Sequence, residues 1–163
     1  MEIRIKSTGQ VMFENEWRKW VAQTYQKSVG PISDEVLQMF DSDPVFEGPQ
    51  ASGGTVYQYS MRQGVEQQSD GKWYTKYILG PIFVDNDAGT AAEQETAYKE
   101  SKDKEQAANV RTARNTMLAE CDWTQLSDSP VDKTAWATYR QALRDVPAQS
   151  GFPWNVQWPA KPE

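Results

Sequence analysis

The sequence contains no histidine and only one cysteine, Cys121. Without histidine, Ser-His-Asp and Cys-His catalysis, histidine-ligated metals and the commonest general base near neutral pH are excluded. A single cysteine excludes an intrachain disulfide, a Cys-x-x-Cys redox pair and a cysteine-rich zinc site. We therefore expect a chain that suits a reducing compartment or does not depend on one. Cys121 is expected to end an apolar stripe as a buried thiol.

Long hydrophobic runs are also missing. Apolar residues make up 38% of the 163 residues, the mean hydropathy is −0.78, and apolar stretches are short. This pattern predicts no membrane span. Residues 1–6 begin no apolar h-region, which predicts no signal peptide. Seven Trp, seven Tyr and five Phe bury large areas, so one domain or two small ones can still form a modest core.

The charge balance is acidic, with a formal net charge of −6. It argues against a nucleic-acid partner bound through bulk electrostatics. Carboxylates remain as catalytic candidates, and Glu14/Glu16 and Asp41/Asp43 are the closest clusters. Nothing in their spacing places two carboxylates across a cleft, as a glycosidase requires, so we expect surface groups or helix caps and no enzyme. Residues 85–87 lack the glycine and glutamate of a calcium loop, and we expect neither a metal nor a cofactor.

Residues 1–86 are predicted to form an N-terminal α+β unit. Alternating apolar residues on either side of a glycine-containing turn predict a β-hairpin at the start. The spacing of Trp17 and Val21 predicts a helix over residues 14–26 that covers this hairpin. Ser33 is placed to cap a second, short helix.

Aromatic residues dominate the remainder of that unit. Residues 55–60 and both halves of residues 65–79 alternate like strands, and Ser69-Asp70-Gly71 is a strong hairpin signal. These segments predict an antiparallel meander with one aromatic face. The fold class predicted for the chain is α+β, with a small antiparallel β and short-helix unit followed by a long helix and a C-terminal helical hairpin.

Residues 87–163 are predicted to form a helical unit. The run from Thr90 to about Glu120 contains no proline or glycine and is rich in helix-forming residues. Its first part, Glu93–Gln106, is almost wholly polar, which predicts a solvent-exposed spacer or an arm that lies against a partner. Its last part carries an apolar stripe that can pack against a second helix.

The second helix is predicted to start at Ser129-Pro130, with Ser129 as its cap, and to stop at Pro147. Together the two helices form an αα-hairpin. Its expected core is Leu118, Trp136, Tyr139 and Leu143, with Trp123 at the connector end. Beyond it, the proline-rich residues 151–159 predict an extended, polyproline-like tail.

Aromatic and arginine side chains, which dominate protein interfaces, collect at this end of the chain. The residues predicted to bind a partner are Arg140, Arg144, Trp154 and Trp158. Two alternatives remain open. The arginines can pair with carboxylates of the same hairpin, and the tryptophans can pack back onto it because exposed tryptophan promotes aggregation.

The last third of the chain resembles a known family. The run R-T-A-R-N-T-M-L-A-E-C-D-W-T-Q-L starts at Arg111, W-A-T-Y-R-Q-A-L-R-D starts at Trp136, and G-F-P-W starts at Gly151. Over about residues 105–159 these segments closely resemble the phage tail assembly chaperone domain and the C-terminal part of phage tail fibre assembly proteins. The first two thirds resemble, more generally, proteins of marine phages that infect cyanobacteria.

This resemblance implies a binding protein with no active site. It implies a phage tail or tail-fibre associated protein that aids assembly and can remain in the virion. The implied partner is a phage tail fibre or tail structural protein, with a homo-oligomer allowed in an assembly and with no membrane partner. The implied location is the virion tail, or the host cytoplasm during assembly. The alternative is a permanent structural virion protein, such as a fibre, baseplate or capsid-surface component; a hydrolase is the third class.

Overall fold

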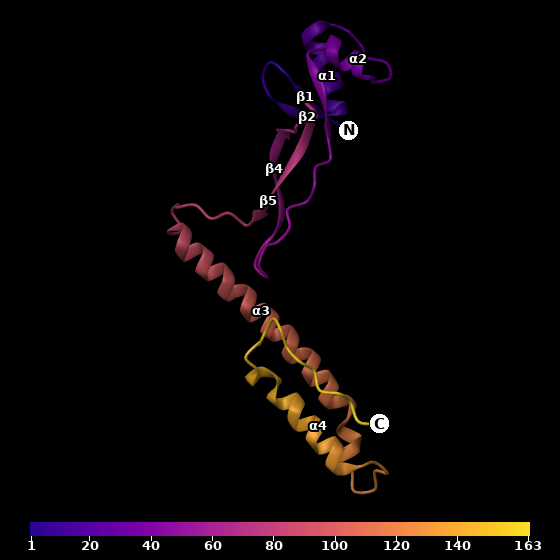
Figure 1. Ribbon diagram of the computed structural model, residues 1–163, viewed down its shortest axis with the longest axis vertical. Helices are drawn as coiled ribbons and strands as arrows, with labels where there is room; N and C mark the ends of the chain where they lie inside the picture. Colours follow the sequence, from indigo (N-terminus) through magenta and orange to yellow (C-terminus); the bar gives the residue numbers. More distant parts are fainter. The chain divides into compact units, whose positions relative to one another are not determined.

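The computed structural model describes residues 1–163 and shows an α+β fold, as predicted (Figure 1). The chain divides into two compact units, Met1–Ile82 and Phe83–Glu163. The strands all lie in the first unit and the long helices in the second. No helix is both long enough and apolar enough to cross a membrane.

The first unit is built on a five-stranded sheet with the strand order β2-β1-β3-β5-β4. The strands are β1 (Glu2–Ile5), β2 (Val11–Phe13), β3 (Ser42–Phe46), β4 (Tyr59–Gln67) and β5 (Trp73–Gly80). Neighbouring strands are antiparallel except β3 and β5, which are parallel and pair Val45 with Trp73. The sheet is therefore mixed, and the predicted antiparallel arrangement is wrong only for the pair β3 and β5.

Two helices cover one face of this sheet, α1 (Glu14–Tyr25) and α2 (Asp34–Met39). The buried core between them comprises Ile3, Ile5, Trp17, Val21, Leu37 and Phe40, which confirms that α1 covers the N-terminal hairpin. The Trp17 indole N–H donates to Ser42 Oγ at 2.9 Å, so its one polar atom is satisfied. Ser33 caps α2 as predicted, because its Oγ accepts from the backbone N–H of Val36 at 3.3 Å.

The predicted three-stranded meander is also wrong. Residues 59–67 form one strand, β4, which a bulge between Arg62 and Val65 interrupts without ending it. Gly64 occupies this bulge with φ at 78°, a left-handed conformation that suits glycine. A glycine that bulges a strand and a glycine that ends one look alike in sequence, so one strand was interpreted as two.

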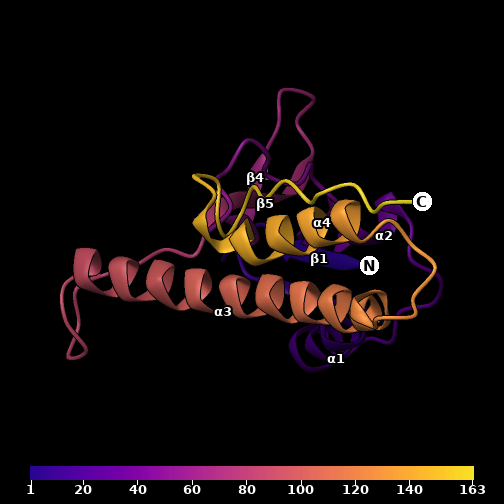
Figure 2. The ribbon, with the colours of Figure 1, turned by 90° about the horizontal axis from the view of Figure 1, so that it is seen from below.

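The second unit contains α3 (Ala91–Glu120), the 3-10 helix η1 (Asp122–Gln125), α4 (Lys133–Asp145) and the 3-10 helix η2 (Val146–Ala148). Helices α3 and α4 run side by side as an antiparallel hairpin (Figures 1 and 2). The long helix spans the predicted run. At its start the Thr90 hydroxyl accepts from the Glu93 N–H at 3.3 Å, and Glu93 Oε2 accepts from the Thr90 N–H at 2.9 Å, the two bonds of a capping box.

The cap of α4 differs from the prediction. Asp132 supplies it, with Oδ1 accepting from the N–H groups of Thr134 at 2.9 Å and Ala135 at 3.1 Å. Ser129 lies in the connector, and its buried hydroxyl has no hydrogen-bond partner. Serine and aspartate are equally good N-caps, so the choice between them depends on where the connector ends.

The tail after α4 folds back along the hairpin (Figure 2), and the prediction of an extended, polyproline-like segment is wrong for its first residues, 151–155. Residues 151–155 form a tight turn in which the Asn155 N–H donates to the Gly151 carbonyl at 2.7 Å. A Cβ on Gly151 would lie 2.0 Å from the Asn155 carbonyl oxygen, so only glycine fits this turn. The Gln149 side chain then holds the returning chain through two hydrogen bonds to the Gln157 backbone, of 2.7 and 2.8 Å.

Candidate functional site

The C-terminal hairpin has its own core, made where α3 ends and α4 begins. Its buried members are Cys121, Trp136, Tyr139 and Leu143, with Met117, Leu118 and Val131 packed around them. The rings of Trp136 and Tyr139 meet edge to face, with centroids 5.7 Å apart. The Trp123 ring packs against Trp136 from the connector side in a tilted arrangement, with centroids 6.2 Å apart. The predicted core and the position of Trp123 are thus confirmed.

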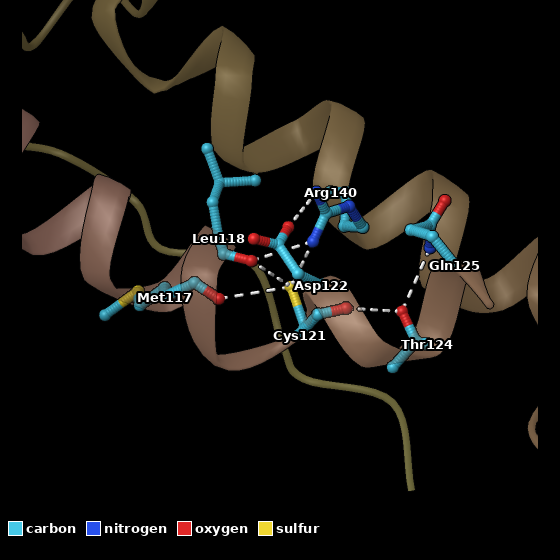
Figure 3. Close-up of polar contacts among 7 residues, drawn as sticks. All are labelled: Met117, Leu118, Cys121, Asp122, Thr124, Gln125 and Arg140. Carbon is cyan, nitrogen blue, oxygen red and sulfur yellow. Dashed lines mark hydrogen bonds and ion pairs between the residues drawn. The ribbon is translucent and has the colours of Figure 1, made fainter. Parts of the chain in front are cut away.

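A buried arginine ties the connector to α4 (Figure 3). Arg140 is only 8% exposed. Its Nη1 donates to the Leu118 carbonyl at 2.8 Å and to Cys121 Sγ at 3.0 Å, and its Nη2 donates to Asp122 Oδ1 at 2.7 Å. Burial alone would lower the pKa of Arg140, but the bonds to Asp122 and Cys121 outweigh it and raise that pKa. The guanidinium therefore stays charged and holds α3, η1 and α4 together.

Cys121 lies at the centre of this arrangement as a free, buried thiol. Its Sγ donates to the carbonyls of Met117 at 3.1 Å and Leu118 at 3.2 Å, so the thiol closes the last turn of α3. The neighbouring Tyr139 has a raised pKa, first because it is buried and then because Cys121 and Glu120 lie nearby. The prediction of a buried structural thiol is confirmed.

The predicted partner-binding residues occupy different environments. Arg140 is taken up by its own chain, as the alternative of pairing within the hairpin requires. Trp154 is half-buried, and its indole N–H donates to Asp103 on α3 at 2.6 Å. Trp158 is 38% exposed, and Arg144 is exposed on α4 and forms no ion pair. The structure therefore leaves Arg144 and part of Trp158 accessible, and uses Arg140 and Trp154 inside the unit.

The connector presents apolar side chains that the sequence predictions did not include among the binding residues. Trp123 is 50% exposed and Leu126 is 59% exposed. Both residues belong to the turn that ends η1, in which the Leu126 N–H donates to the Trp123 carbonyl at 3.2 Å. Their positions in the D-W-T-Q-L run were the available signal, but Trp123 was interpreted only as a cap on the core.

The carboxylates that the sequence offers as catalytic candidates lie in the first unit. The chain contains no group of three His, Cys, Asp or Glu side chains arranged to hold a metal ion. The Glu14 carboxylate of the first unit pairs with Arg18 at 2.9 Å, and Asp43 lies 3.6 Å from Lys6. These carboxylates act in surface ion pairs, and the features with binding character are the connector and the arginines of the hairpin.

Comparison with known proteins identifies this same region. Residues 107–163, about a third of the 163-residue chain, match the family model described as phage tail assembly chaperone protein. The match begins in α3 where its buried residues begin, at Ala107, and includes the connector, α4 and the tail. The chain has no significant match among curated proteins or solved structures. The match connects the C-terminal hairpin with phage tail assembly.

Proposed function

We propose that this protein acts in phage tail assembly by binding a tail or tail-fibre protein through its C-terminal hairpin. The observation that carries the proposal is that three features occur in the same segment of the chain. The family match, the hairpin core and the exposed connector all lie within residues 107–163. A chaperone-type binding surface needs apolar side chains that reach the solvent, and Trp123 and Leu126 supply them.

The rigidity of the connector supports this role. The Thr124 side chain is fully buried and donates to the Cys121 carbonyl at 2.6 Å. The Arg140 bonds fix the start of the same segment. Exposed aromatic groups on a preorganised loop lose little conformational entropy when they bind, and that favours affinity.

A permanent structural role in the virion is the alternative. An assembly factor that leaves is absent from purified particles or present in few copies, whereas a structural component is present at a symmetric copy number. Quantitative mass spectrometry of purified virions separates the two. We propose the transient role, and a copy number that matches the tail symmetry would replace it with the structural one.

The binding proposal is tested by co-expressing the full-length chain with individual tail and tail-fibre proteins of its phage, followed by affinity capture. Replacing both Trp123 and Leu126 with alanine should weaken capture by at least about tenfold, because central aromatic anchors dominate interfaces. The matched control is the pair Met39→Ala and Val56→Ala, which truncates similarly exposed side chains in the first unit. Full capture by the Trp123/Leu126 variant would place the binding surface elsewhere.

A further inference from the structure

Helix α3 and helix α4 carry four arginines, of which only Arg140 is paired with a carboxylate. The remaining three are Arg111, Arg114 and Arg144. Arg111 and Arg144 are exposed, and Arg114 is half-buried with its guanidinium bonded to the uncharged Asn115 side chain at 2.9 and 3.2 Å. No acidic residue occurs between residues 106 and 119. Three full positive charges therefore remain without an internal counter-charge on an otherwise acidic chain.

These arginines lie on one flank of the hairpin. Residues four or seven apart on a helix share a side, so Arg144 follows Arg140 along α4, and Arg114 and Arg111 precede Leu118 along α3. Arg140 reaches across to Leu118 and Asp122, which shows that its side of α4 faces that side of α3. Because the helices are antiparallel (Figure 1), Arg144 lies one turn further along, toward Arg114.

The tail covers a different side. Pro159, Ala160 and Pro162 line a shallow hollow together with Ala135, Thr138 and Ala142 of α4. Thr138 and Ala142 are each offset by two residues from Arg140 and Arg144, which is roughly 200° around a helix. The tail approaches the arginine flank only at Arg111, which lines a shallow hollow on α3 with Phe152 and Pro153. The Phe152 ring lies 5.1 Å from the Arg111 guanidinium. A ring beneath a cation orients it without neutralising it.

We infer that this flank, defined by Arg111, Arg114 and Arg144, binds an acidic segment of a partner protein. The inference rests on the proposed function and gives the partner surface its chemistry. Guanidinium groups bind carboxylates in a bidentate way, and three of them along one flank match a run of Asp and Glu side chains. A nucleic acid fits less well, because the net charge of −6 opposes a phosphate backbone.

The test uses the full-length chain and a fluorescent oligo-glutamate peptide, read by anisotropy. Wild-type protein should bind this peptide more weakly as salt increases. The double variant Arg111→Gln/Arg144→Gln should lose at least about tenfold in affinity. The matched control, Lys19→Gln/Lys27→Gln, removes the same charge from exposed sites of the first unit and should bind like wild type. Circular dichroism should show both variants folded.

The outcomes separate this inference from the proposed function. Equal affinity of the arginine variant and wild type for oligo-glutamate overturns the inference, even if tail proteins are still captured through Trp123 and Leu126. A variant that loses duplex DNA binding but keeps oligo-glutamate binding also overturns it, in favour of a nucleic-acid surface. Arginine-dependent oligo-glutamate binding without capture of any tail or fibre protein supports the flank and contradicts the proposed function.

Discussion

The two units bury their central tryptophans in different ways. In the first unit Trp17 is fully buried and donates to Ser42, which in turn donates to the Phe40 carbonyl at 2.9 Å. In the second unit Trp136 is almost as buried, yet its indole N–H has no partner. A buried unpaired donor costs free energy. The second core tolerates this cost. Its short charge-assisted hydrogen bonds are made by Arg140 instead, next to the connector that we propose for binding.

Truncating the tryptophan of the second core should have the largest effect. Trp136→Ala should cost about 3–5 kcal/mol, because it empties the space among Tyr139, Leu143 and Cys121. The hairpin should unfold while the first unit keeps its own transition. Calorimetry shows this as the loss of one of two melting steps. A melting temperature within a couple of degrees of wild type would remove Trp136 from the core.

Arg140 should rank next. Arg140→Gln removes the guanidinium bonds to the Leu118 carbonyl, to Cys121 Sγ and to Asp122, at a cost of about 2–3 kcal/mol. Asp122→Asn should cost less than about 1 kcal/mol, because the Asp122 side chain is 67% exposed. Urea unfolding of both variants measures the difference. Equal losses would mean that the ion pair, and not the buried guanidinium, stabilises the connector.

Replacing each tryptophan by phenylalanine sharpens the comparison of the two cores. Both substitutions remove similar ring volume, but only Trp17→Phe breaks a hydrogen bond. We expect Trp17→Phe to lose about 1–2 kcal/mol more than Trp136→Phe in denaturant unfolding. If Trp136→Phe proves the costlier change, ring packing rather than hydrogen bonding distinguishes the cores.

The smallest effect is expected at the start of α3. The bonds that Glu93 accepts from the Thr90 backbone and side chain lower its pKa. A lowered folded-state pKa stabilises the helix above the ordinary glutamate pKa, and this contribution disappears as pH falls through the folded value. The protection factors for hydrogen exchange at residues 91–94 should therefore fall between about pH 7 and about pH 3 in wild type and change less in Glu93→Ala. An equal fall in Glu93→Ala would assign the effect to other groups.

The sequence was most informative where one local signal decides the structure. Helix α3 was predictable from its composition, and Ser33 from its position before an apolar run. Strand β3 was not, because Asp43-Pro44 resembles a turn. Proline is tolerated there because pairing with β5 begins only at Val45, so at Pro44 the strand has β1 alone beside it. That depends on a register between segments far apart in the chain.

The candidate site was predictable as a region and not residue by residue. Aromatic and arginine content located the C-terminal hairpin, but sequence gives no burial. Arg140 and Arg144 are one helical turn apart and similar in context, yet one is buried and the other exposed. The sequence likewise does not distinguish the exposed Trp123 from the half-buried Trp154. Trp154 is held by a hydrogen bond to Asp103, which lies 51 residues away in the chain.

The rate at which the single thiol is modified measures how often the hairpin opens. Cys121 is the only sulfhydryl in the chain and is 2% exposed, so a thiol-specific reagent reacts only when α4 separates from the end of α3. The modification rate then reports how often α4 separates from the end of α3, and no substitution is needed to introduce the reporter. A tail component that stabilises the closed connector would lower the modification rate of Cys121, and one that binds the open form would raise it.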